Sequence, residues 1–155
     1  MVNAEKDRYF MNLALDEARK AFDSGEVPVG CAIVRDGEII ALSGNNRESK
    51  FDPTGHAEMI ALRTAGEKIG SRSLENCTIY VTLEPCPMCM SAIMLARIRR
   101  LVFGARDPKM GAVSSEFNLA QEPAFCHSII VSENILGNEC SALINRFFEN
   151  LRTKK

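Results

Sequence analysis

Two stretches decide the fold of this chain: Asp52-Pro-Thr-Gly-His-Ala-Glu58 and Thr78-Ile-Tyr-Val-Thr-Leu-Glu-Pro-Cys-Pro-Met-Cys89. In the first, an Asp-Pro-Thr-Gly turn signal runs directly into a segment of helical pattern, Glu58 to Arg63. In the second, an apolar strand-like run ends at two prolines, and Pro87 suits the first position of a following helix. We therefore expect each stretch to open a helix, with a strand directly before the second.

Helices and strands alternate on both sides of these stretches. Residues 6–24 carry apolar side chains at helical spacing, a helix is expected over 88–97, and a final helix over 135–152. Strands are expected over 27–34, 38–42, 78–83, 100–103 and 128–132, with Asp36-Gly37 as a hairpin turn between the first two. This order predicts an α/β fold, a three-layer αβα sandwich on a mixed five-stranded sheet. The segment 104–127 is long enough for a crossover, so the last two strands should be parallel.

The two expected helix starts bring reactive side chains together. We expect His56 in the first turn of its helix, about 200° around the axis from Glu58, so the two can converge only beyond the helix N-terminus. Cys86 and Cys89 repeat this arrangement, and the helix dipoles favour their thiolate forms. A zinc ion with three protein ligands keeps a position for water, whose pKa it lowers. We therefore predict zinc on His56, Cys86 and Cys89, with Glu58 as the catalytic proton carrier, a set suited to hydrolytic deamination.

Other interpretations of these residues stay open at this point. A Cys-x-x-Cys pair also occurs in structural zinc sites and in redox proteins, and Cys77 could supply a fourth ligand that would close the site. A zinc-stabilised binding module without catalysis would need no Glu58. Replacing Glu58 separates that module from an enzyme.

Composition limits the class of protein. The chain has 155 residues, a formal net charge of −1 and six cysteines. We expect one domain over residues 1–155, because the length suffices for one core. No apolar run is long enough to cross a membrane, and the N-terminus lacks the pattern of a signal peptide, so a cytoplasmic location is expected. The cysteines should then be thiols or metal ligands rather than disulfides, and the four outside the zinc set, Cys31, Cys77, Cys126 and Cys140, should be buried as small apolar residues.

Several further stretches carry a family resemblance. They are Glu26-Val-Pro-Val-Gly30, Asn45-Asn-Arg-Glu48, Asp52 to Glu58, Tyr80-Val-Thr-Leu-Glu-Pro-Cys86, Ala96-Arg-Ile98 and Val102-Phe-Gly-Ala-Arg-Asp-Pro-Lys109, with Gly111 and Phe147-Phe148 beyond them. With these residues the chain resembles the tRNA adenosine deaminases of the cytidine deaminase-like superfamily. The resemblance covers nearly the whole chain and is most specific in its middle third. The chain departs from the family pattern at Gly55, Met90, Ser91 and Cys126.

The resemblance implies a reaction, a substrate and an assembly. The reaction is zinc-dependent deamination of adenosine to inosine at the wobble position of a tRNA anticodon loop, with one Zn²⁺ per subunit of a homodimer. Asn45 would contact the flipped purine, Val29 would line the base pocket, and Asp107 and Lys109 would lie beside the RNA. The helix after Cys89, with Met90, Ile93, Met94 and Leu95, is the expected dimer interface. The alternative is a free nucleobase or nucleoside deaminase of the guanine or cytosine type, which would use the same zinc site and ignore RNA.

The charge gives the RNA interpretation limited support. A net charge of −1 is not typical of a nucleic-acid-binding protein, but basic residues cluster locally. Local clusters can contact phosphates whatever the total charge. These clusters are Arg97 with Arg99 and Arg100, Arg106 with Lys109, and Arg146 with Arg152, Lys154 and Lys155.

Overall fold

Strands and helices alternate along the chain in the computed structural model, which describes residues 3–154. The elements are α1 (Ala4–Asp23), β1 (Gly30–Arg35), β2 (Glu38–Gly44), α2 (Ala57–Ile69), β3 (Cys77–Leu83), α3 (Pro87–Leu95), β4 (Arg100–Ala105), β5 (Ile130–Ser132) and α4 (Gly137–Thr153). Two short 3-10 turns, Leu119–Gln121 and Pro123–Phe125, lie in the connection between β4 and β5. Each predicted helix and strand is present, with ends shifted by a few residues.

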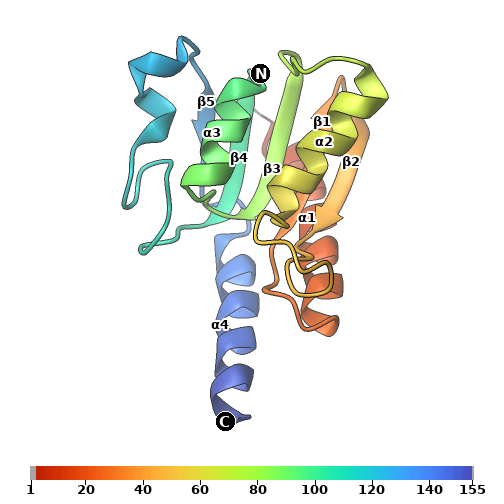
Figure 1. The fold of residues 1–155 in the computed structure, drawn as a ribbon, viewed down its shortest axis with the longest axis vertical. Helices are drawn as coiled ribbons and strands as arrows, with labels where there is room; N and C mark the ends of the chain where they lie inside the picture. Colours follow the sequence, from red (N-terminus) through yellow and green to blue (C-terminus); the bar gives the residue numbers. More distant parts are fainter. Residues whose placement is uncertain (1–2, 155) are drawn as a thin grey trace.

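The sheet has the strand order β2-β1-β3-β4-β5. β1 pairs antiparallel with β2 and β3, whereas β3 with β4 and β4 with β5 are parallel. Helices α2 and α3 cover one face of the sheet, and α1 and the first turns of α4 pack on the other. Figure 1 shows that α4 then continues beyond the end of the sheet. This confirms the three-layer αβα sandwich on a mixed sheet and the parallel pairing of the last two strands.

The core divides into two apolar clusters, one on each face of the sheet. Side chains alternate along a strand, so Cys31 and Ile33 of β1 point to one cluster and Ala32 and Val34 to the other. The first cluster packs the sheet against α2 and α3, and the second packs it against α1 and Cys140 of α4. Both faces of the central strands are therefore buried, which explains their continuous apolar sequences.

Gly30 sets how closely α1 approaches the sheet. A Cβ atom at Gly30 would lie 1.8 Å from the Ala14 carbonyl oxygen, which belongs to the main chain of α1. At the hairpin, Asp36 and Gly37 have φ angles of 52° and 77°, as the predicted Asp-Gly turn requires. The close approach of α1 therefore requires glycine at position 30, and the turn between β1 and β2 is favoured by the Asp36-Gly37 pair.

Some expectations from the sequence are wrong. Residues 27–29 are not part of β1, because Pro28 has no N–H and the Val29 N–H bonds locally to the Val27 carbonyl at 2.8 Å. Cys126 is exposed, whereas Cys31, Cys77 and Cys140 are buried as expected.

No helix among residues 3–154 is both long and apolar enough to cross a membrane.

The helix α3 is apolar on all sides, and this changes its expected role. Met90, Ile93 and Met94 are at most 1% exposed and pack into the core, so they are not an interface. Of the four residues named for a dimer contact, only Leu95 lies on the surface, with 68% of its area exposed.

Candidate metal centre

His56 and Cys86 occupy equivalent positions in the fold. Each is the N-cap residue of its helix, with extended backbone angles of −83° and 146° for His56 and −73° and 172° for Cys86. Neither side chain caps its own helix, so the ring and the sulfur remain available. The first turns of α2 and α3 lie side by side at one end of the sheet (Figure 1). The sequence placed His56 inside the first turn, and the structure places it one position earlier.

Three side chains converge between these helix starts: His56, Cys86 and Cys89. The His56 Nδ1 atom lies 3.6 Å from the Cys86 sulfur and 3.5 Å from the Cys89 sulfur. A tetrahedral zinc with Zn–S of about 2.3 Å and Zn–N of about 2.0–2.1 Å would hold such atoms about 3.6 Å apart. The donor types and their spacing therefore fit one zinc ion.

Within the described part of the chain, the candidate metal-ligand group consists of three residues. Cys77, the possible fourth ligand, begins β3, whereas Cys86 follows the other end of that strand. Cys77 pairs with Arg35 on β1 and does not belong to the group of His56, Cys86 and Cys89. Three protein ligands are typical of catalytic rather than structural zinc, so the closed structural site with Cys77 is excluded.

The electrostatics of the group suit a cation. Hydrogen bonding with Cys89, and then with His56, lowers the pKa of Cys86 to about 4 despite its partial burial. The pKa of Cys89 is raised, because its proton is shared with the Cys86 thiolate and because it is buried. The hydrogen bond with Cys86 raises the pKa of His56. The trio thus concentrates negative charge on sulfur between two positive helix ends.

Glu58 lies beside the trio without belonging to it. It is in the first turn of α2, two residues after His56, and is 4% exposed. Burial raises the pKa of Glu58 to about 7, and the negative Cys86 adds to this rise. A buried carboxyl group next to a cation site, outside the ligand set, can accept and return protons.

Asn45 is 8% exposed, and its position is fixed by its neighbours. Its backbone N–H donates to the Val29 carbonyl at 3.1 Å, and its Oδ1 accepts the Ala57 N–H at 2.8 Å. Its amide oxygen is therefore engaged by the start of α2, and the amide NH₂ is the group left for a ligand. Val29 is 5% exposed and holds Asn45 through its backbone.

Two buried glutamates, Glu26 and Glu84, were quoted in the sequence motifs but received no role there. The Glu26 carboxylate accepts the backbone N–H groups of Glu48, at 3.0 Å, and Ser49, at 2.8 Å, in the segment that leads to His56. Glu84, two residues before Cys86, accepts hydrogen bonds from the segment after β4. The available signal was an acidic residue next to apolar positions, which must find partners if it is buried.

Asp107 and Lys109 lie in that segment after β4. The Asp107 carboxylate accepts the N–H groups of Lys109, at 3.0 Å, and Met110, at 3.2 Å, so it shapes a turn. Among the basic residues, Arg100 is bound to Asp7 at 2.7 Å and 12% exposed, and Arg106 pairs with Glu133 at 2.7 Å. Arg100 is therefore not available to a phosphate, and Lys155 lies outside the described residues.

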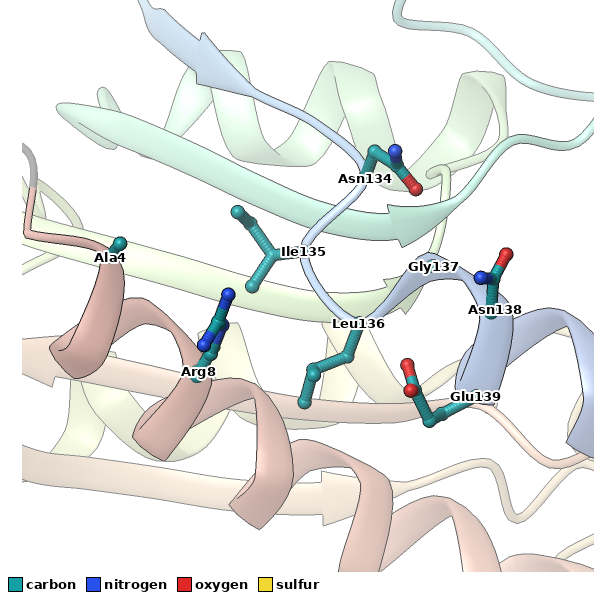
Figure 2. Close-up of a pocket in the computed structure, with 8 residues that line it drawn as sticks. All are labelled: Ala4, Arg8, Asn134, Ile135, Leu136, Gly137, Asn138 and Glu139. Atoms are coloured by element: carbon teal, nitrogen blue, oxygen red, sulfur yellow. The ribbon is translucent and has the colours of Figure 1, made fainter.

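A surface hollow of about 480 Å³ lies apart from the metal centre, on the face covered by α1 and α4. Figure 2 shows Arg8 of α1 beside Ile135 and Leu136, which lead into α4, with Asn138 and Glu139 on the first turn. It contains none of the three metal ligands and no nucleophile. The chemistry therefore belongs to the start of α2 and α3 and not to this hollow.

A family model of zinc-binding deaminases matches the part of the chain that holds the metal centre. The family model described as "Cytidine and deoxycytidylate deaminase zinc-binding region" matches residues 4–105. Fold, metal centre and this match together define a zinc-dependent deaminase domain.

Similarity to individual proteins is more specific. The tRNA-specific adenosine deaminase of Bacillus subtilis (strain 168) is 45% identical over 150 residues, which cover 97% of this chain and 93% of that protein. A solved structure from a study of A-to-I editing by tRNA:A34 deaminases has a TM-score of 0.85 at 45% identity, covering 87% of this chain and 98% of the other. The guanine deaminase of Nitrosomonas europaea, 23% identical over 90% of this chain and 83% of its own, has a TM-score of 0.77 and shares the fold. The chain belongs to the tRNA-specific adenosine deaminase family.

Proposed function

We propose that this protein deaminates adenosine to inosine at the wobble position of a tRNA anticodon loop. The observation that carries the proposal is the His56–Cys86–Cys89 trio with Glu58 beside it, in a chain similar over nearly its full length to tRNA-specific adenosine deaminases. A zinc ion bound by the trio would act as a Lewis acid that lowers the pKa of a water molecule.

The protein side chains supply the rest of the chemistry. Glu58 accepts one proton from the attacking water and delivers it to a ring nitrogen of the purine, and it then carries the second proton, from the added hydroxyl, to the amino group, which leaves as ammonia. The amide NH₂ of Asn45 donates to an acceptor on the purine, since the Asn45 oxygen is bound to Ala57. Val29 packs beside the base, where its small apolar side chain excludes water.

The substrate is a nucleotide that is already unpaired. An anticodon-loop base can be turned out of its stack at little cost compared with a base in a duplex. The segments 45–56 and 106–117 flank the metal centre, and the second carries Asp107 and Lys109, which we place beside the RNA. A phosphate contact by the exposed Lys109 would make binding depend on salt.

We also propose a setting for this activity. Residues 1–155 act as one deaminase domain in the cytoplasm, where tRNA is found, and the protein works as a homodimer. Of the four apolar residues expected at the interface, Leu95 is the one exposed to a partner. Sedimentation at several concentrations tests the dimer, which predicts about twice the chain mass of 17.1 kDa.

The deciding experiment compares substrates. Zinc-loaded protein is incubated with an anticodon stem-loop that carries adenosine at the wobble position, and separately with free adenine, guanine, cytosine and their nucleosides. Inosine in the stem-loop, with ammonia release from the free compounds at least about 100-fold slower, supports the proposal. Fast release from guanine or cytosine without inosine in the RNA would replace it with the free-base alternative. The same stem-loop with guanosine at that position is the control.

A further inference from the structure

Glu84 is a buried carboxylate that the chemistry above does not use. It lies between the end of β3 and Pro85 and is 2% exposed. No salt bridge among the described residues involves Glu84. A buried charge without partners is very unfavourable, so its partners show what it does.

All of its hydrogen-bond donors come from one segment. The backbone N–H of Asp107 donates to Oε1 at 3.2 Å, and those of Val113, Ser114 and Ser115 donate to Oε2 at 3.0, 3.0 and 3.1 Å. The Ser115 hydroxyl also donates to Oε1. Residues 107–115 therefore wrap around a single carboxylate.

The fit between the segment and the carboxylate is tight. A Cβ at Gly111 would lie 2.5 Å from the Glu84 Cδ and 2.4 Å from the Asp107 carbonyl oxygen. On the other side, the Ala112 N–H bonds to the Pro85 carbonyl at 2.8 Å. The segment thus has main-chain and side-chain attachments to the residues directly before Cys86.

Asp107 connects this anchor to the RNA side of the segment. Its own N–H is bound to Glu84, while its carboxylate accepts the N–H groups of Lys109 and Met110. The position of the Lys109 backbone therefore depends on Asp107, and that of Asp107 on Glu84. A change at Glu84 should reach Lys109 without touching a metal ligand.

We propose that Glu84 is a positioning residue for RNA binding: its carboxylate holds residues 107–115 in the shape that presents Asp107 and Lys109 to the tRNA next to the metal centre. This inference rests on the proposed function for its substrate. The anchoring itself does not depend on the substrate and can be measured separately.

The first test measures the anchor. Glu84→Gln keeps the size of the side chain, but its NH₂ group would face backbone N–H donors. Hydrogen exchange at the amides of 107 and 113–115 should be at least about tenfold faster than in the wild type, because charged hydrogen bonds of this kind are lost. Glu26→Gln is the matched control, since Glu26 anchors residues 48 and 49 and should leave the exchange of 107–115 unchanged.

The second test measures substrate binding. With zinc content unchanged, E84Q should raise KM for the stem-loop about tenfold and change kcat less than about twofold. Lys109→Ala should raise KM in the wild type but add little in E84Q, because the lysine is already misplaced there. Gly111→Ala keeps the Glu84 charge and displaces the segment, so it should reproduce the KM effect if E84Q fails to fold.

The outcomes separate the two hypotheses. Unchanged exchange over 107–115 in E84Q would overturn the anchoring, whatever the substrate proves to be. Faster exchange with a fall in kcat and an unchanged KM would overturn the positioning role, as would fully additive effects of E84Q and K109A. Absence of inosine with wild-type enzyme would instead refute the proposed function, and the exchange result would still stand.

Discussion

Asp7 of α1 forms a buried charged network whose removal tests how the layers are held together. It is 2% exposed and accepts hydrogen bonds from Tyr80 Oη at 2.9 Å and from Arg100 Nη1 and Nη2 at 2.8 and 2.7 Å. Arg100 also donates to Ser132 at 2.9 Å, so one helix and three strands are joined. The change we consider is Asp7→Asn, which removes the charge and keeps the shape.

The expected loss follows from the burial of both partners. The side chains of Arg100 and Asp7 are 12% and 2% exposed, so solvent screens them little. The Arg100 Nε atom is already buried without a partner among the described residues, and the guanidinium would lose its counter-charge. Breaking a buried pair on one side costs about 3–5 kcal/mol. For a domain of this size that loss lowers Tm by about 6–20 °C.

The pH dependence of this loss has a definite sign. Burial raises the pKa of Asp7, but hydrogen bonds from Arg100 and Tyr80 and the Arg100 charge outweigh it, so the pKa lies below its ordinary 3.8. The native state therefore gains stability from ionised Asp7 above pH 3.8, and this gain is lost as pH falls through the lower native pKa. The difference between wild type and D7N should shrink in the same window.

Urea unfolding followed by circular dichroism measures both effects. Asp16→Asn is the matched control, because Asp16 pairs with Arg19 on the same helix with side chains 59% and 52% exposed, and should cost about 0.5 kcal/mol or less. If D7N were as stable as D16N near neutral pH, or if its deficit stayed constant on acidification, the network would not hold the layers as argued.

Three further changes probe the site and the packing. Cys89→Ala removes one of the two sulfurs of the trio, so zinc per chain, measured by mass spectrometry, should fall well below about one. The control is Cys126→Ala, which changes an exposed cysteine outside the trio and should keep the zinc content. Equal zinc content in the two variants would contradict the ligand set. Gly30→Ala would place a methyl group 1.8 Å from the Ala14 carbonyl oxygen, so it should lower Tm sharply or prevent folding. The control is Gly25→Ala, where a methyl group has free space but φ is 81°, and which should lower the free energy of unfolding by about 1 kcal/mol. A well-folded G30A protein with unchanged Tm would refute the close approach of α1. Asn45→Ala leaves the buried Ala57 N–H without its acceptor, so it should lower the free energy of unfolding by about 1–3 kcal/mol and slow deamination. A variant with wild-type stability and rate would show that Asn45 neither stabilises the start of α2 nor contacts the base.

The sequence predicts the layers and the metal trio because both depend on local patterns. Apolar runs bounded by turn residues marked the strands, and prolines and turn signals marked the starts of α2 and α3. The shift of His56 from the first turn to the N-cap is a one-residue difference at a helix boundary, where assignment is least certain. These features need no knowledge of distant segments.

Features that depend on distant segments could not be predicted in the same way. Glu84 is bound by backbone N–H groups 23 to 31 positions away, in a loop without periodicity. The apolar residues of α3 fitted an interface as well as a core, and only the packing of α2 and the sheet around them decides for the core. Cys126 lies in the irregular segment between β4 and β5, where residue type says little about burial.

The most direct measurement replaces Glu58 in the zinc-loaded protein. Glu58→Gln keeps the size of the side chain next to the metal centre and removes its ability to carry a proton. We predict zinc content equal to the wild type and wobble inosine formation in the stem-loop slowed by about 10²- to 10⁴-fold. Inosine formed at the wild-type rate by a zinc-replete E58Q protein would contradict the assignment of Glu58 as the proton carrier.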